Sequence, residues 1–283
     1  MILLAESGST KTDWALIGDS EVSRMQTIGL NPYYLSEKEI AREIAQVLSA
    51  FASSTISEVY FYGAGCSTEL MQNKISSILK KAFPTVKVVV ETDMLAACFG
   101  LLKNNAGIAG ILGTGSNACF YDGKKIKRTI PSNGIWLGDE GSGGYFGKTL
   151  VSNYLSNRLP EQLHKSFEAT FEDKRDQIIE KVYQQKRPNA YLASFAPFLY
   201  EYQNDSFVQE ILQDGFTDFF HNICRNLPNA SNQEIHLTGS IAFHFSETIL
   251  KVAKGMDLKI MEIEKSPMNG LVEYYQRNMD EVT

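Results

Sequence analysis

Two short turns in the sequence carry the small, hydroxyl-bearing residues that can hold a phosphate. Ser7 to Thr12 (SGSTKT) joins two apolar runs within residues 2–19, and Gly113 to Asn117 (GTGSN) joins two apolar runs within residues 110–123. Two apolar runs joined by such a turn predict a β-hairpin, and the N–H and hydroxyl groups of the turn could surround an anion. One turn alone is more often ordinary hairpin punctuation. The repetition predicts a phosphate held between two halves of the chain.

Carboxylates stand beside the first turn and at the end of a later apolar run. Glu6 directly precedes the turn and could hold Mg²⁺ through water, while Lys11 adds positive charge. Asp93 follows the apolar run 86–90 and begins a predicted helix. That position suits a helix N-cap. It also suits a base at the ligand-binding edge of an α/β sheet, where a carboxylate can take the proton of a substrate hydroxyl.

Two further segments combine glycine with polar residues. Gly134 to Gly144 (GIWLGDEGSGG) contains Trp136, whose indole face suits a sugar ring; a flexible loop before a helix capped by Asp139 or Ser142 is the alternative. The segment 142–149 nearly matches a Walker A motif, but no buried strand precedes it, so we reject that motif. Leu237 to Ser240 (LTGS) predicts a strand and a glycine turn that a ring or a phosphate could approach.

The order of predicted elements indicates an α/β fold of mixed sheets, in which each half opens with three strands and continues with strand–helix units. We predict strands at 21–28, 58–62, 87–90, 126–130, 234–238 and 258–262 besides the two hairpins, and helices at 40–51, 69–83, 93–102, through most of 141–226, after 240 and at 268–277. Residues 36–39 have the spacing of a capping box.

The length of 283 residues suggests two domains. We place the first at 1–105 and the second at 106–267, the second carrying a helical insertion at about 141–226. The C-terminal helix, 268–283, is a candidate to complete the first domain.

Composition excludes several classes of function. The net charge is −6 and no long basic run is present, so we expect no nucleic-acid partner. We expect neither a signal peptide nor a membrane span, since the apolar runs are short and Glu6 interrupts the first. The four cysteines and four histidines show no metal-ligand spacing. Unpaired cysteines fit a reducing, cytoplasmic location.

Together these motifs resemble the actin/hexokinase/Hsp70-type ATPase superfamily, and within it the N-acetylglucosamine kinases and the BadF/BadG/BcrA/BcrD ATPases. Residues 7–12 and 113–117 are similar to the two phosphate motifs of the family, and residues 237–240 are similar to its adenosine motif. The resemblance covers essentially the whole chain. It implies two ribonuclease H-like domains, each a mixed sheet flanked by helices, around a central cleft.

Carried over by position, the resemblance implies that Asp93 is the general base and that Glu6 holds Mg²⁺. The sugar would contact Asn31, Trp136, Gly138 and Asp139. The nucleotide would contact Gly8, Ser9, Thr10, Lys11, Thr114, Gly115, Ser116, Asn117, Gly239 and Ser240. Two positions depart from the family: Glu6 stands where Asp is usual, and Gly134-Ile135-Trp136 stands where Gly-Trp-Gly is usual.

The resemblance therefore predicts a cytoplasmic kinase that uses ATP and Mg²⁺ to phosphorylate the 6-hydroxyl of N-acetylglucosamine or a related amino sugar. Two alternatives stay open. One is an ATP-hydrolysing activator of a dehydratase or reductase, which would need cysteines for an iron–sulfur cluster. The other is a non-catalytic sugar sensor on the same fold. We expect a small-molecule amino sugar as partner and leave a homodimer open.

Overall fold

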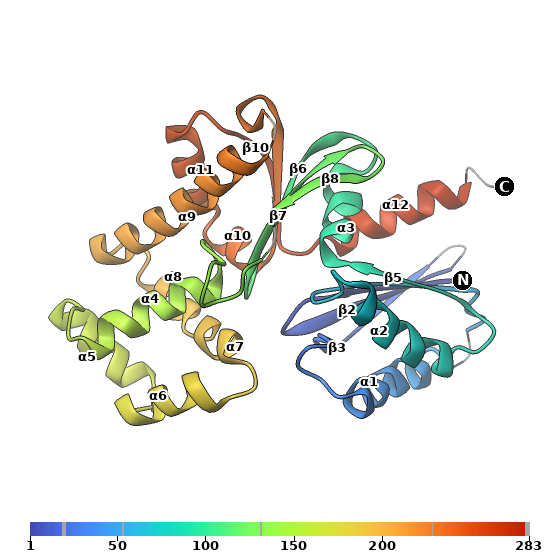
Figure 1. Cartoon of the computed structure of the whole chain (residues 1–283), viewed down its shortest axis with the longest axis horizontal. Coiled ribbons are helices and arrows are strands. Elements are labelled where there is room, and N and C mark those ends of the chain that lie inside the picture. Colours follow the sequence, from blue (N-terminus) through green and yellow to red (C-terminus); the bar gives the residue numbers. More distant parts are fainter. Residues whose placement is uncertain (19–20, 53, 131, 228, 281–283) are drawn as a thin grey trace. The chain divides into compact units, whose positions relative to one another are not determined.

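The computed structural model of the chain describes residues 1–283 apart from 19–20, 53, 131, 228 and 281–283 (Figure 1). Asp19, the last residue of the stretch 2–19 that contains the first predicted hairpin, and the last three residues of the predicted helix 268–283 therefore lie outside the described residues. The chain divides into two compact units, Met1–Asn105 with Ser266–Thr283, and Ala106–Lys265. Each unit contains a mixed five-stranded sheet flanked by helices, which confirms the predicted α/β class.

The first sheet has the strand order β3-β2-β1-β4-β5. Its strands are β1 (Ile2–Ser7), β2 (Lys11–Ile17), β3 (Val22–Ile28), β4 (Glu58–Gly63) and β5 (Lys87–Thr92). The first three form an antiparallel meander, whereas β1, β4 and β5 run parallel. Ser7 aligns with Gly63, and Gly63 aligns with Thr92, so the C-terminal ends of these three strands meet at one edge.

Alternating apolar residues of β1 place a core on both faces of this sheet. Leu3 and Ala5 pack under α1 (Glu37–Ala50) and α2 (Glu69–Ala82), and Ile2 and Leu4 pack under α12 (Met268–Asp280). The predicted capping box at the start of α1 is confirmed, because the side chains of Ser36 and Glu39 each bond to the other's backbone N–H.

The predicted helix 93–102 is only half α-helical. It begins as α3 (Asp93–Ala97) and continues as a π-helix, Cys98–Leu102, closed by the Lys103 N–H on the carbonyl of Cys98. The backbone of Pro267 and of α12 lies against this turn: an added Cβ at Gly100 would lie 2.5 Å from the carbonyl oxygen of Pro267, and one at Gly270 would clash with the carbonyl of Gly100. The chain returns to the first unit at Ser266, slightly before residue 268, where the sequence analysis placed that return.

The second sheet repeats this plan with the strand order β10-β9-β6-β7-β8. Its strands are β6 (Ala106–Leu112), β7 (Ser116–Asp122), β8 (Ile126–Ile130), β9 (Glu234–Thr238) and β10 (Lys259–Glu264). Thr238 aligns with Ile111 on one side and with Glu264 on the other, so the parallel strands β6, β9 and β10 also end at one edge.

The segment between β8 and β9 is helical, as predicted. It contains α4 (Gly143–Leu155), α5 (Glu161–Thr170), α6 (Arg175–Gln184), α7 (Pro188–Ala193), α8 (Ala196–Glu201), α9 (Ser206–Asn226) and a 3₁₀ turn at Ala230–Asn232. Two helices follow β9, α10 (Ser240–His244) and α11 (Ser246–Gly255). Buried aromatic side chains from α4, α5, α8 and α9 join the sheet residues in one continuous core.

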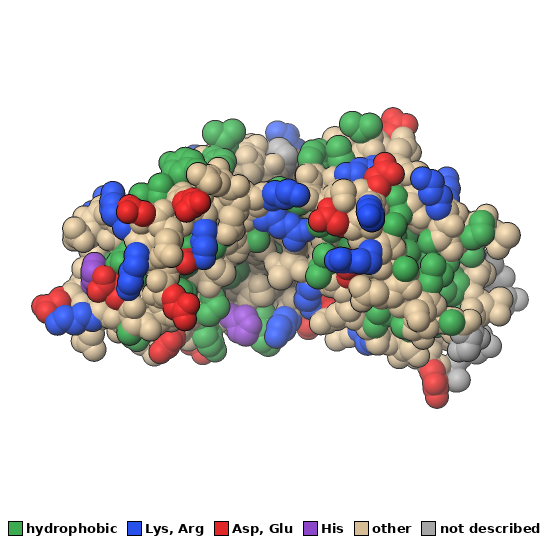
Figure 2. Space-filling view, turned by 90° about the horizontal axis from the view of Figure 1, so that it is seen from below, with side chains coloured by type: hydrophobic (Ala, Val, Ile, Leu, Met, Phe, Trp, Pro, Cys, Tyr) green, Lys and Arg blue, Asp and Glu red, His purple; other side chains and the backbone are tan. Residues whose placement is uncertain are grey.

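Two surface properties bear on the expected partners. Lys, Arg, Asp and Glu side chains are interspersed on the face shown in Figure 2. Within the described ranges, no helix combines the length and the apolar character needed to cross a bilayer.

Candidate functional site

The parallel edge of the first sheet gathers three of the predicted site residues. Glu6 is the penultimate residue of β1, and Asp93 directly follows β5. Asn31 is buried and lies beside the end of β4. An added Cβ at Gly65, two residues after that strand, would lie 2.5 Å from the Oδ1 atom of Asn31. Segments far apart in the sequence thus present two carboxylates and an amide at the edge where α/β sheets bind ligands.

Asp93 is held in a fixed orientation at the start of α3. Its Oδ1 atom accepts the N–H of Met94 at 2.9 Å and the hydroxyl of Thr92 at 3.1 Å. Burial raises the pKa of the Asp93 carboxyl, although these hydrogen bonds oppose the shift. The predicted N-cap role of Asp93 is wrong, since Thr92 occupies that position and Asp93 is the first helical residue.

Glu6 lies among other carboxylates with little compensating charge. Burial, and then the charges of Asp93 and Asp13, raise its pKa to about 8, while Lys11 lowers it. The Lys11 ammonium itself lies 2.8 Å from Asp13. Burial and the neighbouring carboxylates thus disfavour the ionised form of Glu6, and a divalent cation bound there would supply the missing positive charge. Mg²⁺ usually takes only one or two carboxylates plus phosphate and water.

No group of three or more His, Cys, Asp or Glu side chains in the described part of the chain is arranged to hold a metal ion alone. A magnesium ion at Glu6 would therefore depend on ligands from substrate and water.

The first turn uses two of its hydroxyl groups internally. Ser7 Oγ lies 2.8 Å from Thr12 Oγ1 and accepts the N–H of Leu30, while Thr12 donates to the carbonyl of Ile28. These bonds tie the chain after β3 to the turn, as does the N–H of Gly29 on the carbonyl of Thr10. The hydroxyls of Ser7 and Thr12 are therefore committed to bonds within the protein, and neither residue is among those expected to contact the nucleotide.

The second turn is fixed by the helix that follows the glycine-rich loop. The N–H groups of Gly143 and Gly144, in the first turn of α4, donate to the carbonyls of Gly113 and Thr114 at 2.8 and 3.0 Å. Gly239 has a left-handed φ of 113°, and an added Cβ there would clash with the carbonyl of Leu112. The structure thus brings the second phosphate motif and the adenosine motif together, backbone against backbone.

Asp139 also lies against the second turn. Its Oδ1 atom accepts the Ser132 hydroxyl at 2.5 Å, and its Oδ2 atom lies 2.9 Å from where a Cβ on Gly115 would be. Burial raises the pKa of the Asp139 carboxyl, whereas Ser132 and the backbone N–H groups of Ser116 and Gly134 lower it. Ser142, not Asp139, caps α4. Asp139 therefore links the glycine-rich loop to the turn.

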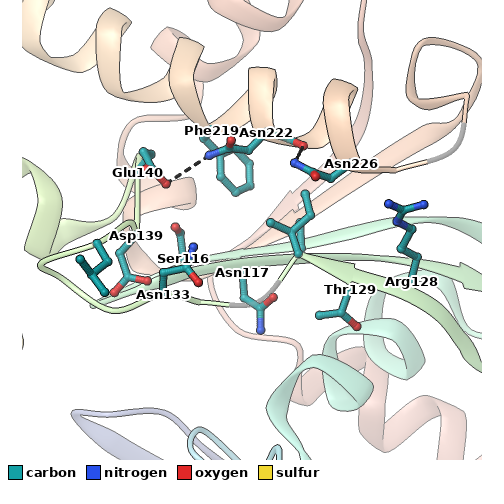
Figure 3. Close-up of a pocket in the computed structure, with 13 residues that line it drawn as sticks. Ser116, Asn117, Arg128, Thr129, Asn133, Asp139, Glu140, Phe219, Asn222 and Asn226 are labelled. Carbon is teal, nitrogen blue, oxygen red and sulfur yellow. Dashed lines mark hydrogen bonds between the residues drawn. The ribbon is translucent and has the colours of Figure 1, made fainter.

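A cavity of about 410 Å³ opens beside this carboxylate (Figure 3). Its lining includes Ser116 and Asn117, predicted for the nucleotide, and Asp139, predicted for the sugar. Sequence analysis missed the residues on its other side, because helical periodicity alone does not say which sheet a helix covers. The cavity is lined by Ser116, Asn117, Ala118, Arg128, Thr129, Ile130, Asn133, Leu137, Asp139, Glu140, Phe219, Asn222 and Asn226.

Three α9 residues, Phe219, Asn222 and Asn226, lie on the helix side of the cavity in Figure 3, and Asn222 Nδ2 donates to Glu140 at 3.2 Å. Gly138 and Trp136 do not line the cavity. Gly138 closes the loop turn through its N–H on the carbonyl of Gly134.

Trp136 is 53% exposed at the tip of that turn. Its indole stacks on Tyr183 of α6, with ring centroids 6.3 Å apart and planes 8° from parallel.

Neither the protein-family models nor the curated protein sequences contain a match to this chain. Among solved structures, the chain is 37% identical to a protein from Porphyromonas gingivalis provisionally assigned as an N-acetylglucosamine kinase. That match covers 99% of this chain and 100% of the other, with a TM-score of 0.91. The chain belongs to the N-acetylglucosamine kinase family of sugar kinases. The resemblance inferred from the motifs is thereby confirmed, and the protein is a phosphotransferase of the sugar kinase type.

More distant structures share only the fold. A protein from Chromobacterium violaceum with the same provisional assignment is 16% identical, with a TM-score of 0.71 over 96% of this chain and 98% of that one. A ROK-family glucokinase from Streptomyces griseus, solved with glucose and AMPPNP, is 14% identical, with a TM-score of 0.57 over 97% and 98% of the two chains.

Proposed function

We propose that this sugar kinase transfers the γ-phosphoryl group of ATP to the 6-hydroxyl of N-acetylglucosamine or a closely related amino sugar. The observation that carries the proposal is Asp93, a buried carboxylate with a raised pKa, held by the Met94 N–H at the ligand-binding edge of its sheet. A carboxylate of this kind can accept the hydroxyl proton while the oxygen attacks phosphorus. The family and the AMPPNP-bound glucokinase support ATP as the donor.

The remaining residues would bind and orient the substrates. The backbone of Gly8, Ser9 and Thr10, with Lys11 beside it, would contact phosphate in the first unit. In the second unit the nucleotide would contact Thr114, Gly115, Ser116, Asn117, Gly239 and Ser240. The amino sugar would contact Asn31, Trp136, Gly138 and Asp139. Magnesium held through Glu6 would neutralise phosphate charge.

A coupled assay of ADP release tests this proposal. We expect purified protein with ATP and Mg²⁺ to give its highest kcat/KM with N-acetylglucosamine, compared with N-acetylmannosamine, glucosamine and glucose. No turnover is expected with 6-deoxy-N-acetylglucosamine, which lacks the acceptor, and NMR of the product should show phosphate on carbon 6. ATP hydrolysis that no sugar accelerates, together with stoichiometric iron after anaerobic purification, would instead indicate the activator class.

A further inference from the structure

Three buried side-chain oxygen atoms without hydrogen-bond partners surround the second turn. They are Asn117 Oδ1, Asn189 Oδ1 and Thr238 Oγ1, and they are three of the four such side-chain atoms found in the described part of the chain. Buried polar groups are nearly always hydrogen-bonded, because leaving one unpaired costs about 1–3 kcal/mol. Their grouping around one turn therefore points to a ligand that completes their bonding.

Two of these atoms belong to β7 and β9, the strands that flank β6 in the second sheet. Asn117 aligns with Ile111 across β7 and β6, and Ile111 aligns with Thr238 across β6 and β9. Aligned residues of adjacent strands project from the same face of a sheet. Asn117 points away from α9 in Figure 3, so Thr238 also projects from the face opposite α9.

The third atom comes from a helix of the insertion, α7, to which the sequence assigned no function. Asn189 and Ala193 are four residues apart and share one face of α7. An added Cβ at Gly143 would lie 3.3 Å from Ala193 Cβ, 3.3 Å from Ile241 Cδ1 of α10 and 3.4 Å from the carbonyl oxygen of Gly113. The face of α7 that bears Asn189 thus packs where α4, α10 and the second turn meet.

An amide oxygen requires a hydrogen-bond donor, which restricts the ligand group that Asn189 can bind. Phosphate oxygens act as acceptors at neutral pH and cannot satisfy it. In a nucleoside triphosphate the donors are the ribose hydroxyls and the amino group of the base. We propose that Asn189 is a nucleoside-binding residue, which accepts a hydrogen bond from one of these donors. The proposal rests on the nucleotide assignment of the second turn made above.

Calorimetric titration of the whole protein tests this assignment with Asn189→Ala and a matched control, Asn153→Ala. Asn153 is a similarly half-buried amide in the same unit, but its Nδ2 atom donates to Thr149 of its own helix at 2.9 Å. One neutral hydrogen bond predicts that Asn189→Ala weakens AMPPNP binding about 3- to 10-fold. Binding of tripolyphosphate and of N-acetylglucosamine should not change, and Asn153→Ala should have no effect. Asn189→Asp, which keeps an acceptor, should retain affinity and also serves if the alanine variant does not fold.

Modified nucleotides identify the donor. One of 2′-deoxy-ATP, 3′-deoxy-ATP and inosine triphosphate should bind the wild type more weakly than ATP does. The same analogue should bind Asn189→Ala as tightly as ATP binds that variant. An equal loss for tripolyphosphate, a loss confined to the amino sugar, or unchanged nucleotide binding would each overturn the proposal. Failure of the wild type to bind any nucleotide would instead overturn the proposed function.

Discussion

Replacing Asp93 by asparagine separates its chemical role from its structural one. The Oδ1 atom that accepts the Met94 N–H and the Thr92 hydroxyl is kept, so the start of α3 should not change. The lost group is the carboxylate that would take the proton. A positioned general base contributes about 10²- to 10⁴-fold, so we expect kcat to fall by that factor, which corresponds to about 2.7–5.5 kcal/mol in the barrier.

Stability should move in the opposite direction to activity. Burial raises the pKa of Asp93 in the folded protein, so the unfolded chain releases this proton first. The wild type therefore loses stability as the pH rises from the ordinary aspartate pKa of 3.8 through the raised value. Asp93→Asn removes that cost, and its Tm at neutral pH should equal or exceed that of the wild type.

The matched control is Glu91→Gln, the same chemical change two residues earlier on β5, at a carboxyl whose pKa burial also raises. Steady-state assays varying ATP and sugar should show the loss of kcat in Asp93→Asn alone, while calorimetry shows unchanged ADP binding. A near-native kcat, or an equal loss in Glu91→Gln, would refute the role of Asp93 as the base.

Three further predictions concern the turns, the metal and the loop. A Cβ at Gly113 meets no atom within 4 Å, as at Gly255. Gly113→Val should therefore leave the Tm unchanged but raise the KM for ATP about tenfold, since overlap with a ligand costs about 1–3 kcal/mol. Gly255→Val should change neither the Tm nor the KM, and equal KM values for the two variants would contradict this prediction. Glu6→Gln should require several-fold more Mg²⁺ for half-maximal activity. It should also lessen the fall in Tm between about pH 5 and 8, to which the Glu6 pKa of about 8 contributes beside the raised pKa of Asp93; a melting profile parallel to that of the wild type would disprove this. Trp136→Phe leaves the buried Trp14, so emission should shift to shorter wavelengths and cease to respond to sugar; a retained response would place the sugar elsewhere.

Local sequence patterns were sufficient to predict most of the fold. The period-two strands, the capping box at Ser36 and the glycine turns encode their conformations within a few residues, so their positions agree closely with the structure. The π-helix at Cys98–Leu102 could not be predicted in this way. It packs against the backbone of α12, a segment remote in the sequence that approaches it through Gly100 and Gly270, and no local pattern signals that contact.

The same distinction applies to the candidate site. The type and position of Asp93 and of the Gly113 turn could be read from the sequence, because strand ends and glycine turns are local features. The internal use of the Ser7 and Thr12 hydroxyls could not, since their backbone partners, Leu30 and Ile28, lie at the end of β3 and just beyond it. Asn189 gave no signal either, because only the packing of α7 on α4 brings it to the turn.

The return of the chain to its first unit has a consequence for the order of folding during synthesis. Domains commonly fold from the N-terminus as they leave the ribosome. Here Ala106–Lys265 is continuous and can fold as soon as it emerges, whereas Met1–Asn105 emerges first but needs α12. Until that helix arrives, Ile2, Leu4 and Ala15 lack their cover on one face of the sheet. The earliest residues to be made should therefore be among the last to reach their native packing, and a released chain that ends at Lys265 should show a protease-resistant second unit and a protease-sensitive first one.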